Sequence, residues 1–146
     1  TIVIVDAGFA QAAADCTGGI CGTPGYIPPE TWMTGHWYPK GDCFSMGVVM
    51  LQLLSDNPEG IFTSGATSID DIRAKTCARE PRLEQIPGKC QDLHSLIGRL
   101  LDKKHPSRIS AVDAVRNHWL AASQLAAERI ATNAAGGSEH GRPNSK

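Results

Sequence analysis

The segment 45–54, with the sequence SMGVVMLQLL, constrains the fold most strongly, because it is apolar on nearly every side. A helix with this pattern is typical of the interior of a larger body, since a surface helix keeps one polar face for water. The chain has 146 residues, which is the size of one domain and is long enough to bury a core. The sequence therefore predicts one mainly α-helical domain built around this segment.

Three further segments carry helix signals. Apolar residues at helical spacing over 93–101 form the strongest amphipathic pattern in the chain. Ser68, followed by two aspartates, predicts the start of a short helix that ends near Cys77. Ser110, with Asp113 three positions later, has the spacing of a capping box. We therefore expect helices in all three places.

The two ends of the chain differ from this helical middle. Residues 1–5 are mostly β-branched, which favours a short buried strand. A stretch rich in Gly and Pro follows up to residue 41 and predicts a long irregular loop, a feature that is usually functional or mobile. Residues 121–135 are rich in alanine and indicate a helical extension, whereas 136–146 are expected to be a disordered tail.

Composition excludes several classes of function. Fourteen basic and fifteen acidic residues give a net charge of -1, and no basic stripe is visible, so we expect no nucleic-acid partner. No apolar run approaches the ~20 residues that cross a bilayer, so we expect no membrane partner. The five cysteines form no C-x-x-C pair, which argues against a zinc knuckle or a disulfide framework. Free thiols favour a reducing compartment, with the cytoplasm as the expected location and the nucleus as the alternative.

Four motifs in order resemble the C-terminal half of a eukaryotic protein kinase domain. Asp6-Ala7-Gly8 resembles the metal-binding D-F-G segment, and 21–30 (CGTPGYIPPE) resembles the end of the activation segment. Residues 42–49 (DCFSMGVV) resemble the start of the central buried helix, and 100–119 resemble the closing segment with its leucines, proline and arginine. The resemblance covers about residues 1–120 and is closest to the calcium/calmodulin-dependent and calcium-dependent Ser/Thr kinases. It implies the large helical C-terminal lobe of the kinase-like fold, with 1–41 as metal motif and activation segment and 42–120 as helical base.

The resemblance implies roles for three residues near the reaction. Asp6 would offer a carboxylate oxygen to Mg²⁺ and through it bind ATP, because hard cations prefer oxygen ligands. Gly8 would give the backbone freedom that aims this carboxylate. Thr23 would line the substrate cleft. The catalytic base of such kinases belongs to an H-R-D segment, which is expected upstream of the printed sequence.

Three other residues would be structural by the same resemblance. Glu30 and Arg108 match a buried ion pair that ties the activation segment to the helical base. Asp42 matches an aspartate that caps the central helix and holds the backbone of the catalytic loop. A plain helix cap is the simpler interpretation of Asp42, and both roles are compatible.

Two positions depart from the family pattern. Ala7 replaces the aromatic residue whose packing usually sets the active state. Gly19 stands where activatable kinases often carry a phosphorylated threonine, so activation by phosphate at that position is not expected. The sequence also contains no glycine-rich loop and no V-A-I-K lysine.

Two functions follow from this resemblance. The chain is expected to be the C-terminal part of an ATP- and Mg²⁺-dependent Ser/Thr kinase that phosphorylates a protein substrate once the N-terminal lobe completes it, and to be inactive alone. The alternative is a pseudokinase or truncated kinase that acts as an interaction module. Under either function, residues 121–135 would begin a regulatory segment, such as one bound by a calcium sensor, or serve as a passive linker.

Overall fold

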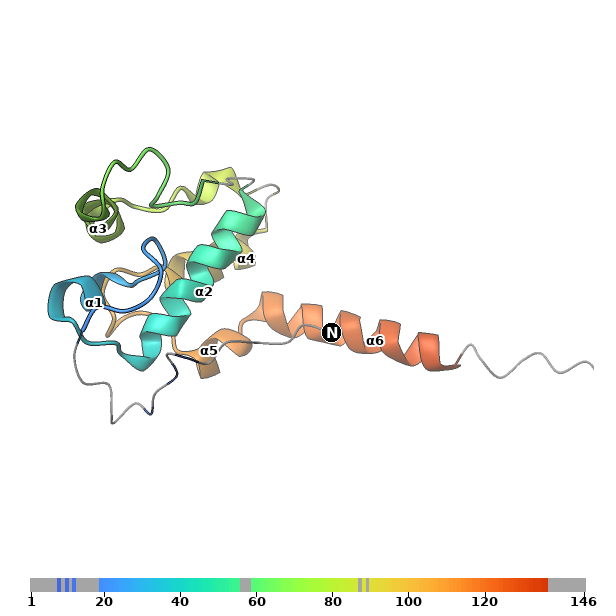
Figure 1. Ribbon diagram of the computed structural model, residues 1–146. Coiled ribbons are helices and arrows are strands. Elements are labelled where there is room, and N and C mark those ends of the chain that lie inside the picture. Colours follow the sequence, from blue (N-terminus) through green and yellow to red (C-terminus); the bar gives the residue numbers. More distant parts are fainter. Residues whose placement is uncertain are drawn as a thin grey trace, which may run out of the picture.

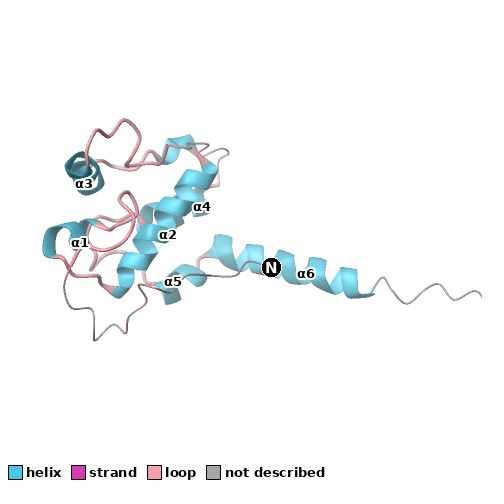
Figure 2. Ribbon diagram, viewed as in Figure 1, coloured by secondary structure: helices cyan, strands magenta, loops and turns pink. Residues whose placement is uncertain are grey.

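A computed structural model describes residues 8, 10, 12, 19–55, 59–86, 88 and 90–136. Within these residues the chain is helical and no strand is present, as Figure 2 shows. The helices are α1 (Pro29–Thr34), α2 (Pro39–Leu54), α3 (Ile69–Ala78), the 3-10 helix η1 (Leu83–Gln85), α4 (Gln91–Leu100), α5 (Ala111–Val115) and α6 (His118–Gly136). The prediction of a mainly α fold is confirmed. The strand expected at residues 1–5 lies outside the described residues.

The helix starts follow the capping signals. The Ser68 hydroxyl accepts a hydrogen bond from the Asp71 amide at 3.1 Å, and the Ser110 hydroxyl accepts one from the Asp113 amide at 3.2 Å. Each serine thereby pairs one of the amide groups that a helix leaves free at its N-terminus. These two predicted helix starts are confirmed.

Helix α2 runs through the body beside α4, as Figure 1 shows. It begins at Pro39, because proline fits the first turn of a helix, so Asp42 lies inside the first turn and Tyr38 is the N-cap. The expectation that Asp42 caps this helix is therefore wrong. The two helices approach closely at Gly47, where an added Cβ would lie 2.9 Å from Leu100 Cβ.

The core fills the space between α2 and α4. Its larger cluster contains Phe44, Val48, Leu51, Ile61, Phe62, Ile86, Leu93, Ile97 and Leu101. A smaller cluster of Cys43, Leu96, Leu100, Ile109 and Ala114 joins the same two helices to α5. Burial of these apolar side chains is the main stabilising contribution to such a body.

Helix α2 is not buried on every side. Met46 is 54% exposed, Val49 39% and Leu53 79%, so one apolar face of the helix is open to solvent. The interior position that the sequence predicted for this segment therefore holds only for the face toward α4.

Helix α6 starts against the body and then leaves it, as Figure 1 shows. At its start, His118 Nδ1 lies 3.0 Å from Asp92 Oδ2 at the start of α4. Farther along, Leu125 and Ile130 are 60% and 72% exposed. The helix reaches Gly136, the first residue of the predicted tail, and 137–146 lie outside the described residues. In the part of the chain that is described, no helix has the length and hydropathy needed to cross a membrane.

Candidate functional site

The loop that precedes α1 bends sharply around Thr23. The Tyr26 amide donates to the Thr23 carbonyl at 3.1 Å, which closes a turn over Pro24 and Gly25. Gly25 has φ +97°, and a Cβ on it would lie 2.8 Å from Thr63 Cγ2. Glycine adopts this positive φ without strain. Because glycine also has no Cβ, the loop can pass close to Thr63.

Two hydrogen bonds hold this loop on α2. The Tyr26 hydroxyl donates to Gln52 Oε1 at 2.9 Å, and the Ser45 hydroxyl donates to the Tyr26 carbonyl at 2.9 Å. Both partners lie on one helix, so the backbone and the side chain of Tyr26 are fixed together. The loop is therefore an ordered surface.

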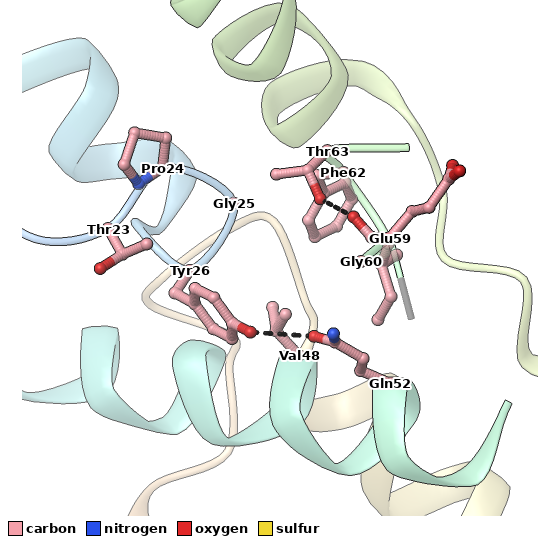
Figure 3. Close-up of a pocket in the computed structure, with 11 residues that line it drawn as sticks. Thr23, Pro24, Gly25, Tyr26, Val48, Gln52, Glu59, Gly60, Phe62 and Thr63 are labelled. Carbon is pink, nitrogen blue, oxygen red and sulfur yellow. Dashed lines mark hydrogen bonds between the residues drawn. The ribbon is translucent and has the colours of Figure 1, made fainter. Parts of the chain in front are cut away.

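A hollow of about 210 Å³ lies between this loop, α2 and residues 59–63. We call it the Thr23 hollow; it is lined by Thr23, Pro24, Gly25, Tyr26, Val48, Gln52, Glu59, Gly60, Ile61, Phe62 and Thr63. Figure 3 shows Thr23 at its edge, with the hydroxyl directed away from Tyr26 and Gln52. The hollow is small, so it can receive one side chain or a short length of peptide.

The far wall of the Thr23 hollow is braced by its own hydrogen bonds. The Thr63 hydroxyl donates to the Glu59 carbonyl, and the Ser64 hydroxyl donates to Glu59 Oε2 at 2.8 Å. Glu59 is the one charged residue in the described lining, and its Oε2 accepts the hydrogen bond from Ser64. The hollow therefore offers a partly apolar surface with hydroxyl and amide groups and one acidic residue, Glu59.

Behind the loop, Arg108 binds Glu30 at the start of α1. Nη1 lies 2.5 Å from Oε1 and Nη2 lies 2.7 Å from Oε2, and the two residues are 1% and 4% exposed. Arg108 also donates to the carbonyl oxygens of Lys40 and Asp102, each at 2.9 Å. A buried guanidinium with this many acceptors is well compensated, so α1 is fixed to the helical base.

The remaining predicted residues lie apart from this cluster or are not described. Asp42 is exposed and accepts a hydrogen bond from Trp37 Nε1 at 2.9 Å. Gly8 is exposed, and Asp6 lies outside the described residues. No group of three or more His, Cys, Asp or Glu side chains suited to a metal ion occurs in the described residues.

Sequence reasoning missed Tyr26, Gln52 and Thr63. Tyr26 and Gln52 are 26 positions apart, and no local pattern links a polar residue in an apolar helix to a loop tyrosine. One signal was available in Gln52 itself, because a polar side chain within SMGVVMLQLL needs a partner or solvent.

Comparison with known proteins identifies the class. The sequence matches the protein kinase domain family over residues 1–120, so the chain belongs to that family. The CaM kinase-like vesicle-associated protein of Danio rerio is 27% identical over 143 residues, which cover 90% of this chain and 32% of the relative. The serine/threonine-protein kinase PBL13 of Arabidopsis thaliana is 33% identical over 102 residues, or 70% of this chain and 18% of the relative. The chain thus spans about a third or less of these relatives.

Proposed function

We propose that the chain is the C-terminal part of an ATP-dependent protein Ser/Thr kinase, completed by an N-terminal lobe with its catalytic loop. The complete domain transfers the γ-phosphoryl group of ATP to a serine or threonine of a protein substrate. Similarity to serine/threonine-protein kinases such as PBL13 supports the Ser/Thr class. In this proposal Thr23 and the Thr23 hollow contact the protein substrate. The kinase acts in the cytoplasm, with the nucleus as the alternative.

The observation that carries the proposal is the fixed position of the loop around Thr23. Tyr26 is bonded to Gln52 on α2, and the following helix is anchored by the Glu30–Arg108 pair. Phosphoryl transfer depends mainly on positioning, so a rigid loop beside a peptide-sized hollow is the kind of surface that a kinase requires for its substrate.

Asp6 is the proposed Mg²⁺ ligand. The carboxylate is the donor type that Mg²⁺ prefers, and the metal, when bound, neutralises charge on the ATP phosphates. Gly8 follows at the right spacing for the family motif. The ion pair of Glu30 with Arg108 then supports this site structurally rather than touching ATP. Asp42, which does not cap α2, keeps only the proposed role of holding the backbone of the upstream catalytic loop.

The first experiment is the denaturing mass of the protein expressed from its own gene. A mass well above 15.6 kDa means a longer protein, which has room for the N-terminal lobe. Phosphorylation of a serine/threonine peptide library is then measured for the full protein and for Asp6→Asn. The proposal expects activity that Asp6→Asn abolishes, whereas the control Asp70→Asn, on α3, retains it. Full activity in Asp6→Asn contradicts the proposal.

A pseudokinase or truncated kinase acting as an interaction module is the second candidate. Ala7 in the metal motif and the exposed apolar face of α2, with Met46, Val49 and Leu53, favour it. Such a face supports packing against further protein. This candidate expects the upstream lysine, the H-R-D aspartate or the asparagine to be replaced, and Asp6→Asn to change little.

A further inference from the structure

The side-chain amide of Gln52 lies in the Thr23 hollow in a fixed orientation. Gln52 is a half-buried residue of α2, and its Oε1 accepts the hydrogen bond from the Tyr26 hydroxyl at 2.9 Å. The same oxygen lies close to Gly60, since a Cβ placed there would be 3.9 Å from it. Because Tyr26 holds Oε1, the direction of the amide nitrogen Nε2 is fixed as well.

The amide nitrogen of Gln52 has hydrogen-bonding capacity to spare. An amide nitrogen carries two N–H donors, and Nε2 makes no hydrogen bond within the part of the chain that the structure describes. This nitrogen is not one of the buried polar atoms that lack a partner, so solvent reaches it. Figure 3 shows Gln52 and Tyr26 directed toward each other at the α2 side of the hollow. Gln52 therefore presents an oriented donor to a group that enters the hollow.

The other polar groups of the hollow are engaged elsewhere. The Thr63 hydroxyl donates to the Glu59 carbonyl, and Glu59 Oε2 accepts from Ser64. Figure 3 shows the Glu59 carboxylate directed away from Gln52. No basic residue belongs to the described lining, so an acidic side chain finds no counter-charge there. A basic side chain in turn finds no carboxylate beside the amide.

Apolar side chains form the remaining walls of the hollow. Val48 and Phe62 are buried, Ile61 is nearly so, and Pro24 belongs to the loop opposite them. Such walls suit the methylene groups of an entering side chain, whereas a charged group between them would lose hydration without compensation. An uncharged side chain that ends in a hydrogen-bond acceptor therefore matches both the walls and the donor on Gln52.

We propose that Gln52 is a specificity-determining residue, whose Nε2 donates to the side-chain carbonyl of an asparagine or glutamine beside the phosphorylated residue of the substrate. The inference rests on the proposed kinase function and names the substrate class that the Thr23 hollow selects. Tyr26 is a positioning residue here, because its hydroxyl orients the amide of Gln52. One neutral hydrogen bond changes affinity by about threefold to tenfold, which sets the size of the preference.

The test compares peptides that differ only in one residue beside the phosphoacceptor serine. Each flanking position is occupied in turn by glutamine, asparagine, methionine, glutamate or lysine, and the phosphorylation rate by the full-length protein is measured. Methionine is the reference, because it has the length of glutamine without the carbonyl. We expect glutamine or asparagine to be preferred over methionine by about threefold to tenfold at one flanking position. Equal rates at every position would overturn the proposal.

Variants of Gln52 test the donor itself. Gln52→Glu replaces the amide nitrogen by a carboxylate oxygen and keeps an acceptor for Tyr26, so the preference should move to lysine at the same position. Gln52→Met should abolish the preference, and Tyr26→Phe should weaken it because the amide is then free to rotate. Gln91→Glu, at the exposed start of α4, makes the same exchange outside the hollow and should keep the wild-type preference. An unchanged preference in Gln52→Glu contradicts the inference.

The ratio of two rates separates this inference from the proposed function. A loss of folded protein lowers the rates of all peptides alike and leaves their ratio unchanged. If the full-length protein phosphorylates no peptide, the proposed kinase function fails. Fluorescence anisotropy then measures the binding of the same peptides with alanine at the acceptor position. Tighter binding of the glutamine peptide that is lost in Gln52→Met supports selection by Gln52, whereas equal binding of the glutamine and methionine peptides overturns it.

Discussion

Arg108 and Glu30 lie 78 positions apart and bind each other through two hydrogen bonds, at 2.5 and 2.7 Å, in a site closed to solvent. This pair joins the start of α1 to the loop between α4 and α5. The loop with Thr23 ends where α1 begins, so its position depends on a contact made far along the chain. The ion pair thus connects the candidate substrate surface to the core.

Glu30→Gln should destabilise the fold by about 3–5 kcal/mol, because it leaves the buried Arg108 guanidinium without its counter-charge. Urea unfolding of the full chain measures the change. Arg116→Gln is the control, since Arg116 and Asp113 are 75% and 59% exposed and lie 3.9 Å apart. That loss should stay within about 1 kcal/mol. Equal losses in both variants would contradict the role given to the buried pair.

Gly47→Ala should cost about 1–3 kcal/mol, even though alanine is the better helix former. The new Cβ would lie 2.9 Å from Leu100 Cβ and Leu101 Cγ, which the packing of α2 on α4 holds in place. In Gly98→Ala the nearest atom is the flexible tip of Leu83, at 3.2 Å, so the change should stay within about 1 kcal/mol of wild type. Thermal unfolding of both variants compares the two sites, and similar transition temperatures would refute the tight contact.

The sequence was sufficient for helices with local capping signals, but it assigned α1 and the first residues of α2 to a long loop, and it was insufficient for the pairings between helices. Ser68 and Ser110 predicted helix starts because capping is local, acting across three residues. Asp42 was wrongly taken as the N-cap because the helix already begins at Pro39. Proline and aspartate are both typical of helix starts, and here both lie within one turn. The Tyr26–Gln52 bond could not be predicted, since it depends on how a loop lies on a helix. Glu30 and Arg108 were paired only through family resemblance, because nothing local joins residues so far apart.

Gly25→Ala should disturb the Thr23 hollow for two separable reasons. The positive φ of Gly25 strains any other residue by about 1–3 kcal/mol, and the added Cβ meets Thr63 Cγ2 at 2.8 Å. Gly65→Ala, with φ +63° and no atom within 4 Å, carries strain alone and should destabilise less. Thr63→Ser removes the clashing methyl group and keeps the hydroxyl, so it should partly restore the stability of Gly25→Ala. Urea unfolding of the four chains checks this order, and a lack of restoration would show that the contact does not matter.

Lys103 should make the stability of the fold depend on pH above neutrality. The unfolded chain keeps this proton until about pH 10.5, whereas the folded chain releases it near pH 8 because burial disfavours the ammonium form. Between these values the unfolded state binds more protons, so the free energy of unfolding rises with pH, by up to about 3 kcal/mol. Lys103→Met cannot titrate and should lose this rise, while Lys104→Met should keep it. Urea unfolding at pH 7, 8.5 and 10 measures the difference between wild type and each variant. If wild type and Lys103→Met differ by the same amount at all three pH values, Lys103 holds its proton as an ordinary lysine does. The Phe44 and Phe62 rings under its Nζ, and the Thr76 carbonyl that accepts from it at 2.7 Å, then offset the cost of burial.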